Sequence, residues 1–205
     1  WANASNAPFR LFKRYTHEGG IATPFIVSWP DGIQAPGLVQ EPTHIIDVMP
    51  TLVALTGAAY PGTYEGQDIL PMEGKSFEDV FETGNWSRPG PIFWEHEGNR
   101  AVRVGEWKLV SELADPSDAS SRAVWELYNM AEDRTELNDW MEGERGRADG
   151  MIAFYNAWAK RCGVLPWPVE GAPRPMGMDV LSRHNHSVRV PSVRFGPKRV
   201  VPGEG

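Results

Sequence analysis

Cationic and titratable side chains gather in one short stretch near the start of the 205-residue chain. Lys13 and His17 come just before Glu18, and the pair Gly19-Gly20 follows directly. The ammonium group of a lysine is a compact positive charge that can hold an anion, and glycines let the backbone approach a ligand closely. A polar loop of this kind on a rigid scaffold is a common place for a binding or catalytic site. From residue types alone, an ordinary solvated loop is the alternative interpretation.

Two elements downstream are expected to position this loop. The apolar run at residues 25–27 lies between two prolines, which favours one buried strand over a helix. Between residues 44 and 57 the apolar residues recur at helical spacing, and a glycine is placed to end the helix. Pro50 either kinks this helix or follows a short turn that leads into it. We expect His44 and Asp47 to cap or pack the helix start.

A turn-rich stretch follows and separates this part from a second unit. Within it, residues 76–81 are expected to form a short helix, with Ser76 as the N-cap and Asp79 as its capping-box partner. Residues 66–91 as a whole are interpreted as a connector on the surface, because prolines and glycines recur along them.

The second unit is predicted to be a small antiparallel sheet with one helix packed on it. Residues 92–110 indicate successive strands with glycines at the turns, and residues 124–130 indicate one more. Residues 151–161 keep helical spacing after a flexible stretch at 143–150, and a glycine is placed to stop the helix. Cys162 is expected to be a small buried side chain of this helix.

Composition limits the class of protein. A net charge of −7 and a pI near 5.3 argue against a dedicated nucleic-acid binder, which needs a basic face. One cysteine cannot form an internal disulfide, and no apolar run approaches the length of a membrane span. The chain starts with Trp1 in the middle of a motif, so we expect it to be the C-terminal portion of a larger protein.

The motif around the glycine pair resembles the second signature region of the type I sulfatases, which include the arylsulfatases. Lys13-x-x-x-His17-Glu18-Gly19-Gly20-Ile21-x-x-Pro24, followed by an apolar run that ends in Trp29-Pro30, carries the resemblance. Residues 66–71 and 103–139 are also similar to later segments of that family. The resemblance implies an α/β fold, namely the C-terminal part of an alkaline-phosphatase-like sulfatase. It divides the chain into the end of the catalytic domain (1–65), the connector (66–91), the sheet-and-helix subdomain (92–163) and a Pro/Gly-rich basic tail (164–205).

The resemblance further implies hydrolysis of sulfate esters by the whole protein. In that family the nucleophile is a formylglycine made from a Cys/Ser-x-Pro-x-Arg motif, and calcium is held by paired acidic residues and a later Asp-Asn. The sequence contains no Cys/Ser-x-Pro-x-Arg motif, no adjacent Asp-Asp and no Asp-Asn, so both groups are expected upstream of this chain. Of the family's catalytic set only the late lysine carries over, onto Lys13, where it would bind the sulfuryl oxygens. The chain alone is therefore expected to be inactive.

Other polar residues are candidates for contact with the substrate. His17 occupies a position that is not always histidine in the family, which favours a role near the substrate or in the structure over that of a general acid. His96, Asn99 and Arg100 lie at a predicted strand turn in the subdomain that, by resemblance, edges the cleft; surface ion pairing is the alternative. The histidines at 184 and 186 are interpreted as solvated.

Two other function classes stay open on the sequence. A phosphodiesterase or phosphonate hydrolase of the same superfamily would share this part of the chain, and so would a non-catalytic subunit that keeps the fold for binding. The expected partners are a sulfated small molecule or carbohydrate and the upstream part of the protein's own catalytic domain. We expect a periplasmic or secreted location, and neither nucleic acid nor a membrane span.

Overall fold

The computed structural model describes residues 1–113, 124–167 and 169. The described residues belong to one compact unit, Trp1–Val169, and the predicted tail from residue 170 on, with its histidines, lies outside them. The helices are α1 (Ala2–Asn6), α2 (Glu18–Ile21), a 3-10 turn η1 (Ile45–Asp47), α3 (Val48–Thr56), α4 (Asp79–Thr83) and α5 (Arg145–Cys162). The strands are β1 (Thr63–Tyr64), β2 (Gln67–Asp68), β3 (Ile92–His96), β4 (Asn99–Val104), β5 (Trp107–Glu112) and β6 (Val124–Asn129).

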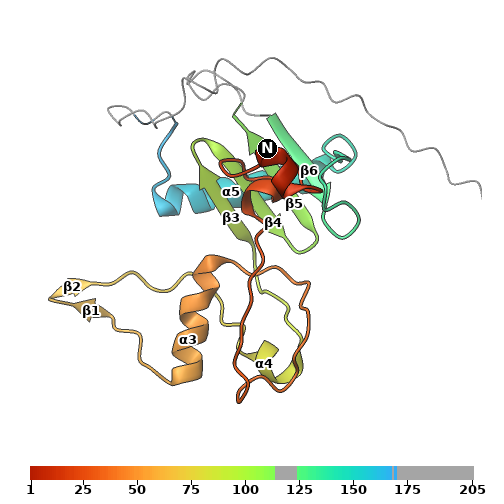
Figure 1. Cartoon of the computed structure of the whole chain (residues 1–205). Helices are drawn as coiled ribbons and strands as arrows, with labels where there is room; N and C mark the ends of the chain where they lie inside the picture. Colours follow the sequence, from red (N-terminus) through yellow and green to blue (C-terminus); the bar gives the residue numbers. More distant parts are fainter. Residues whose placement is uncertain (114–123, 168, 170–205) are drawn as a thin grey trace, which may run out of the picture. The chain divides into compact units, whose positions relative to one another are not determined.

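A four-stranded antiparallel sheet in the order β3-β4-β5-β6 is the centre of this unit (Figure 1). Its register places Val102 opposite Leu109, and Leu109 opposite Leu127. Gly98 and Gly105 sit in the two tight turns with φ of +80° and +57°, a conformation that favours glycine. The predicted strands and their glycine turns are therefore confirmed.

The two faces of the sheet are covered differently. Side chains alternate between faces along a strand, so Val102, Leu109 and Leu127 share one face, where they pack against Met151 and Tyr155 of α5. The opposite face carries a second cluster centred on Ala101, Val110 and Tyr128. Figure 1 shows α5 across the first face and the N-terminal segment, drawn in red, on the other side. The predicted sheet with one packed helix is confirmed.

The helix α5 differs from its prediction at its start but not at its end. It begins at Arg145 rather than near 151, so the stretch predicted to be flexible is helical and contains two glycines. Gly163 ends it in the left-handed conformation, as predicted. The prediction of a buried Cys162 is wrong, because this side chain is exposed. Trp158 already stacks on Phe93 of the edge strand β3, so a residue one turn further along has no strand beneath it.

The predicted helix at residues 44–57 forms. Of the two predicted alternatives, the structure has a short turn that leads into the helix and not a kink at Pro50. The 3-10 turn η1 leads into α3, Pro50 lies in the first turn of α3 where no hydrogen bond is lost, and Gly57 caps the end with φ +65°. His44 and Asp47 form a capping box, in which the Asp47 carboxylate accepts from the His44 backbone N–H at 2.8 Å. Their predicted capping role is confirmed.

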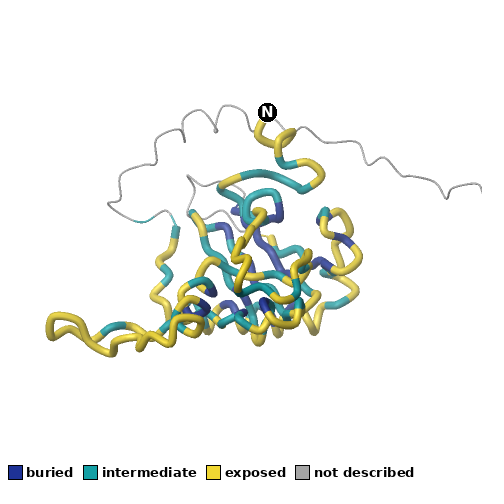
Figure 2. The backbone as a smooth tube through the Cα atoms, turned by 60° about the horizontal axis from the view of Figure 1, so that its bottom comes forward, coloured by how far each residue is buried: buried dark blue, intermediate teal, exposed yellow. Residues whose placement is uncertain are grey.

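The short helix in the connector starts later than predicted. It is α4 from Asp79, its N-cap is Glu78, and no side chain caps it. Ser76 instead accepts from the Glu78 backbone N–H, which makes a local turn before the helix. The β1–β2 hairpin spans the predicted start of the connector at residue 66, and it is exposed along its length (Figure 2).

The prediction of a buried strand at residues 25–27 is wrong for this chain. Phe25 and Ile26 are 54% and 87% exposed, and no strand is assigned there. A strand needs a neighbour for its backbone hydrogen bonds, and no strand among the described residues pairs with this run. Its apolar side chains therefore stay on the surface.

Candidate functional site

Lys13 lies near the middle of a tight loop, residues 10–18, which we call the Lys13 loop. The loop is closed at its base where the Gly19 N–H donates to the Arg10 carbonyl at 2.8 Å. A Cβ on Gly19 would lie 2.2 Å from that carbonyl oxygen, so only glycine fits this approach. The Lys13 side chain is exposed, and no hydrogen bond or ion pair reaches its ammonium group from the residues that the structure describes.

The backbone of the Lys13 loop is strained on either side of the lysine. Leu11 and Arg14 have φ of +62° and +113°, which non-glycine residues adopt at a cost of roughly 1–3 kcal/mol each. Such conformations persist only where the surroundings hold them. The contacts beneath the loop are therefore what determine where Lys13 points.

One group of contacts joins the loop to β6. His17 is 1% exposed, and its Nε2 lies 3.1 Å from Glu126 Oε2. Arg10 Nη1 donates to the Tyr128 hydroxyl at 2.8 Å, and that hydroxyl donates to Glu126 Oε2 at 2.8 Å. Burial alone would raise the pKa of Glu126, but His17, Tyr128 and Arg10 outweigh it and lower the pKa to about 2. Glu126 is therefore a carboxylate throughout the physiological range.

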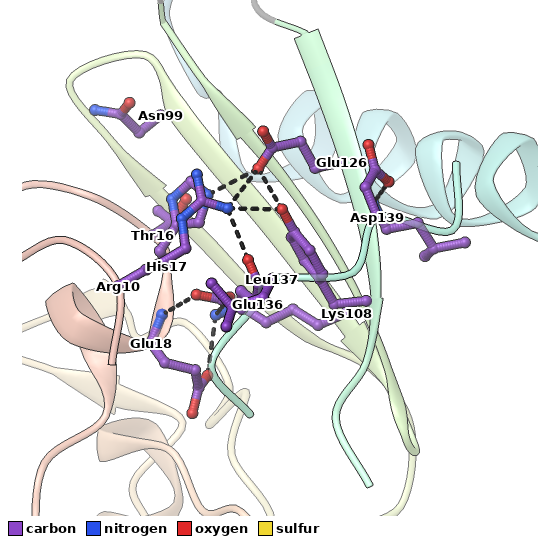
Figure 3. Close-up of polar contacts among 12 residues, drawn as sticks. Arg10, Thr16, His17, Glu18, Asn99, Lys108, Glu126, Glu136, Leu137 and Asp139 are labelled. Atoms are coloured by element: carbon purple, nitrogen blue, oxygen red, sulfur yellow. Dashed lines mark hydrogen bonds and ion pairs between the residues drawn. The ribbon is translucent and has the colours of Figure 1, made fainter. Parts of the chain in front are cut away.

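A second group consists of buried charges between the loop and β5 (Figure 3). Lys108 is 0% exposed, and its Nζ lies 3.0 Å from Glu18 Oε1 and 2.8 Å from Glu136 Oε1. Glu18 Oε2 also pairs with the half-exposed Arg134 at 3.1 Å. Burial would raise the pKa of Glu18, but Lys108 and Arg134 outweigh it and lower that pKa. Two cations and two carboxylates thus balance within one buried network, which we call the Lys108 network.

The β3–β4 hairpin tip also touches the loop next to Lys13. Arg14 pairs with Glu97 at 2.8 Å, and the Asn99 amide donates to the Arg14 carbonyl at 3.3 Å. Thr16 Oγ1 donates to the Arg100 carbonyl at 3.1 Å. The hairpin and the Lys13 loop are therefore joined at Arg14 and at Thr16.

The predicted site residues fall into two sets. Lys13 and His96 are exposed, and His96 ends the strand that leads into the tip. His17 and Asn99 are buried; the Asn99 amide donates to the Arg14 and His96 carbonyls, and its Oδ1 accepts from Leu113 N–H. The Arg100 guanidinium lies over the Trp125 ring at 4.9 Å, on the α5 face. A substrate role for these residues stays a prediction, and the contacts of the last three are those of groups that hold the fold.

Several residues of the two groups were missed at the sequence level. Lys108 lies in the apolar strand Trp107–Glu112, and a charged residue at a covered position must have a buried partner. That signal points to a buried pair but not to its partners, since Glu18 and Glu136 are 90 and 28 residues away.

The described residues offer neither a metal-binding cluster nor a membrane-spanning helix. They contain no group of three or more His, Cys, Asp or Glu that could hold a metal ion. Among the same residues, no helix combines the length and apolar character of a membrane span.

Comparisons with known proteins match this geometry to one family. The family model described as N-sulphoglucosamine sulphohydrolase, C-terminal, matches residues 9–148, which contain the Lys13 loop and the whole sheet. An uncharacterised sulfatase of Schizosaccharomyces pombe is 29% identical over 188 residues, covering 90% of this chain and 33% of that protein. Human arylsulfatase A is 31% identical over 163 residues, covering 70% of this chain and 31% of that protein.

The fold agrees with these sequence matches. A solved Bacteroides thetaiotaomicron sulfatase structure from a locus for glycosaminoglycan metabolism has a TM-score of 0.61 at 19% identity, covering 75% of this chain and 32% of that one. The chain thus spans about a third of the length of the curated relatives it matches. It has the fold of the C-terminal part of the alkaline-phosphatase-like sulfatases, and it belongs to the sulfatase family through the C-terminal domain of that family.

Proposed function

We propose that the full-length protein hydrolyses sulfate esters and that Lys13 binds the sulfuryl oxygens during the reaction. The observation that carries the proposal is an exposed ammonium group with no partner among the described residues, on a strained loop that two sets of contacts hold in place. Membership of the sulfatase family supports the reaction class.

Lys13 suits this role because of its charge and its position. An ammonium group close to the sulfuryl oxygens stabilises the negative charge that grows as the ester bond breaks. A fixed charge of this kind acts most strongly when it needs no rearrangement during the reaction. The Lys108 network beneath the loop supplies that rigidity. Its carboxylates pair with Lys108 and Arg134 and not with the Lys13 ammonium group.

A formylglycine and a calcium ion complete the chemistry that we propose for the full-length protein. When present, they supply the nucleophile and the charge opposite the sulfuryl group. We assign both groups to the upstream part of the protein, because the Cys/Ser-x-Pro-x-Arg and Asp-Asn motifs of the family do not occur in this sequence.

The substrate contact that we propose in this chain is His96. It is exposed at the hairpin tip, and the adjacent Glu97 ties that tip to Arg14, the neighbour of Lys13. It would contact the alcohol half of a sulfated small molecule or carbohydrate. We propose that His17, Asn99 and Arg100 hold the loop and the hairpin in place.

The upstream part of the protein is also the partner that we propose for the exposed apolar surface. Apolar side chains from residues 25–29, α3 and α4 line an open cavity of about 400 Å³. Its lining includes Phe25, Trp29, Leu52 and Leu55, which are exposed in this chain. Covering them would remove apolar area from water, which favours association.

The test of the function is the activity of the full-length protein on esters that differ in the group transferred. We expect turnover of 4-nitrophenyl sulfate above that of bis(4-nitrophenyl) phosphate and of a phosphonate ester. Preference for either phosphorus ester would replace our proposal with a phosphodiesterase or phosphonate hydrolase. No turnover of any of them, with binding of a sulfated saccharide, would indicate a non-catalytic subunit.

A further inference from the structure

Glu136 contacts both limbs of the Lys13 loop, although it lies more than a hundred residues away in the sequence. Its carbonyl oxygen accepts from Arg10 Nη1 at 2.8 Å, at the first residue of the loop. Its carboxylate Oε2 accepts from the Glu18 backbone N–H at 2.8 Å, at the last residue. Figure 3 shows this residue between the two limbs, with Lys108 beside it.

The conformation of Glu136 is itself unusual. It is 0% exposed and has φ +57°, a left-handed conformation that is uncommon for a residue with a side chain. Asp133 holds the turn around it, because Asp133 Oδ2 accepts from the Leu137 and Asn138 N–H groups at 2.7 Å each. In this conformation the carbonyl of Glu136 and its carboxylate both reach the loop.

The two contacts of the Glu136 side chain require its negative charge as well as its left-handed backbone conformation. Its Oε1 lies 2.8 Å from Lys108 Nζ, and Lys108 pairs in turn with Glu18. A neutral amide in its place would present an N–H₂ group toward either Lys108 or the Glu18 N–H, both of which are donors. One of the two contacts would then be lost, and a buried donor would be left without an acceptor.

We propose that Glu136 is a positioning residue for Lys13, which acts by fixing both ends of the loop that carries the lysine. This inference rests on the proposed role of Lys13 in the reaction. Glu136 itself is buried and touches no substrate, so it acts only through the loop. The contacts of the loop with the hairpin tip, such as Arg14 with Glu97, do not involve Glu136 and keep the loop attached when it is changed.

The test is a double-mutant cycle in the full-length protein, with 4-nitrophenyl sulfate as substrate. We expect Glu136→Gln to lower kcat on the order of 10–100-fold with little change in KM, because displacement of a catalytic group by about 1 Å has effects of this size. In the Lys13→Ala background the same Glu136→Gln change should lower kcat less than about threefold, because the group that it positions is gone. A general loss of structure would instead lower kcat equally in both backgrounds.

A control variant separates positioning from stability. Leu109→Ala makes a cavity on the α5 face and lowers the melting temperature without touching the loop, so its kcat at a temperature where it is folded should match wild type. If Glu136→Gln does not fold, Glu136→Asp enters the same cycle, because it keeps the charge beside Lys108 with a shorter reach.

The experiment distinguishes failure of the positioning role of Glu136 from failure of the proposed role of Lys13. Equal kcat losses in both backgrounds, or no loss with Glu136→Gln, overturn the positioning role and leave the role of Lys13 standing. A Lys13→Ala variant with wild-type kcat removes the lysine from the reaction, and the positioning role is overturned with it.

Discussion

Replacing Lys108 with methionine tests whether the Lys108 network stabilises the fold as its geometry indicates. Methionine is similar in length and apolar, so it fills most of the space and removes the charge. Two carboxylates, Glu18 and Glu136, would then share a buried site, in which Glu18 keeps its ion pair with the half-exposed Arg134. Removal of one partner from a buried ion pair typically destabilises a protein by about 3–5 kcal/mol, because the remaining charge has no counterion.

The pH dependence of stability provides a second, independent test of this prediction. In the wild type the pKa of Glu18 is lowered despite burial, so its ionised form contributes stability above its unfolded pKa, and this is lost as the pH falls through the folded pKa. In Lys108→Met the Glu18 carboxylate stays buried but loses the largest of the interactions that offset its burial, so its ionisation stabilises the fold less. We therefore expect the free-energy difference between the two proteins to be largest near neutral pH and to shrink in acid.

The assay is urea unfolding of the 205-residue chain, followed by tryptophan fluorescence at neutral and acidic pH. Lys160→Met is the matched control, since Lys160 is exposed in the last turn of α5 and should change the free energy of unfolding by less than about 0.5 kcal/mol. A loss below about 1 kcal/mol for Lys108→Met, equal at both pH values, would refute the reasoning, because it is the size expected of an exposed pair.

Three further predictions concern single residues. The pKa of Glu126 is held at about 2, below its ordinary 4.5, so this carboxylate contributes stability that is lost as the pH falls from 4.5 toward 2. The melting temperature of Glu126→Gln should therefore fall less than that of the wild type across this range; an equal fall would contradict the prediction. Gly19→Ala places a Cβ 2.2 Å from the Arg10 carbonyl oxygen and should therefore break the hydrogen bond at the base of the Lys13 loop. Amide hydrogen exchange should then become faster in residues 10–18 and stay unchanged in α5. The exposed Cys162 should react with a thiol reagent at one equivalent per native chain; reaction only after denaturation would contradict its exposure.

Local patterns explain why much of the fold could be predicted from the sequence. The strands β3 to β6 follow alternation and short-range turns, and Gly98 and Gly105 adopt the left-handed conformation that those turns require. Gly57 and Gly163 end their helices in the same conformation. In each case the residues that determine the element lie within a few positions of one another, so no knowledge of distant contacts is needed.

The errors arise where tertiary contacts decide. The run at residues 25–27 has the composition of a buried strand, but no described strand pairs with it. Cys162 keeps the helical spacing of the buried stripe, but the sheet ends before it. Helical spacing states which residues share a face, and not how far the opposing surface extends.

In the candidate site, too, local motifs could be predicted from the sequence and distant contacts could not. Lys13 could be proposed from the sequence because its motif is local, with the Glu18-Gly19-Gly20 sequence a few residues away. The residues that hold its loop, Lys108 and Glu136, come from a strand and a turn that only the folded chain brings together. The positive φ of Glu136 could not be inferred either, since no glycine or asparagine marks it.

The central claim is that Lys13 binds the sulfuryl group in the full-length protein, and the kcat of Lys13→Ala on 4-nitrophenyl sulfate tests it most directly. Loss of one preorganised charge in an active site typically lowers kcat on the order of 10²–10³-fold, and the fall should exceed any rise in KM because the interaction strengthens in the transition state. Lys13→Arg should restore only part of the rate, because a planar guanidinium does not replace a compact ammonium group. A kcat for Lys13→Ala within about threefold of wild type, which is under 1 kcal/mol of activation free energy, would contradict the claim.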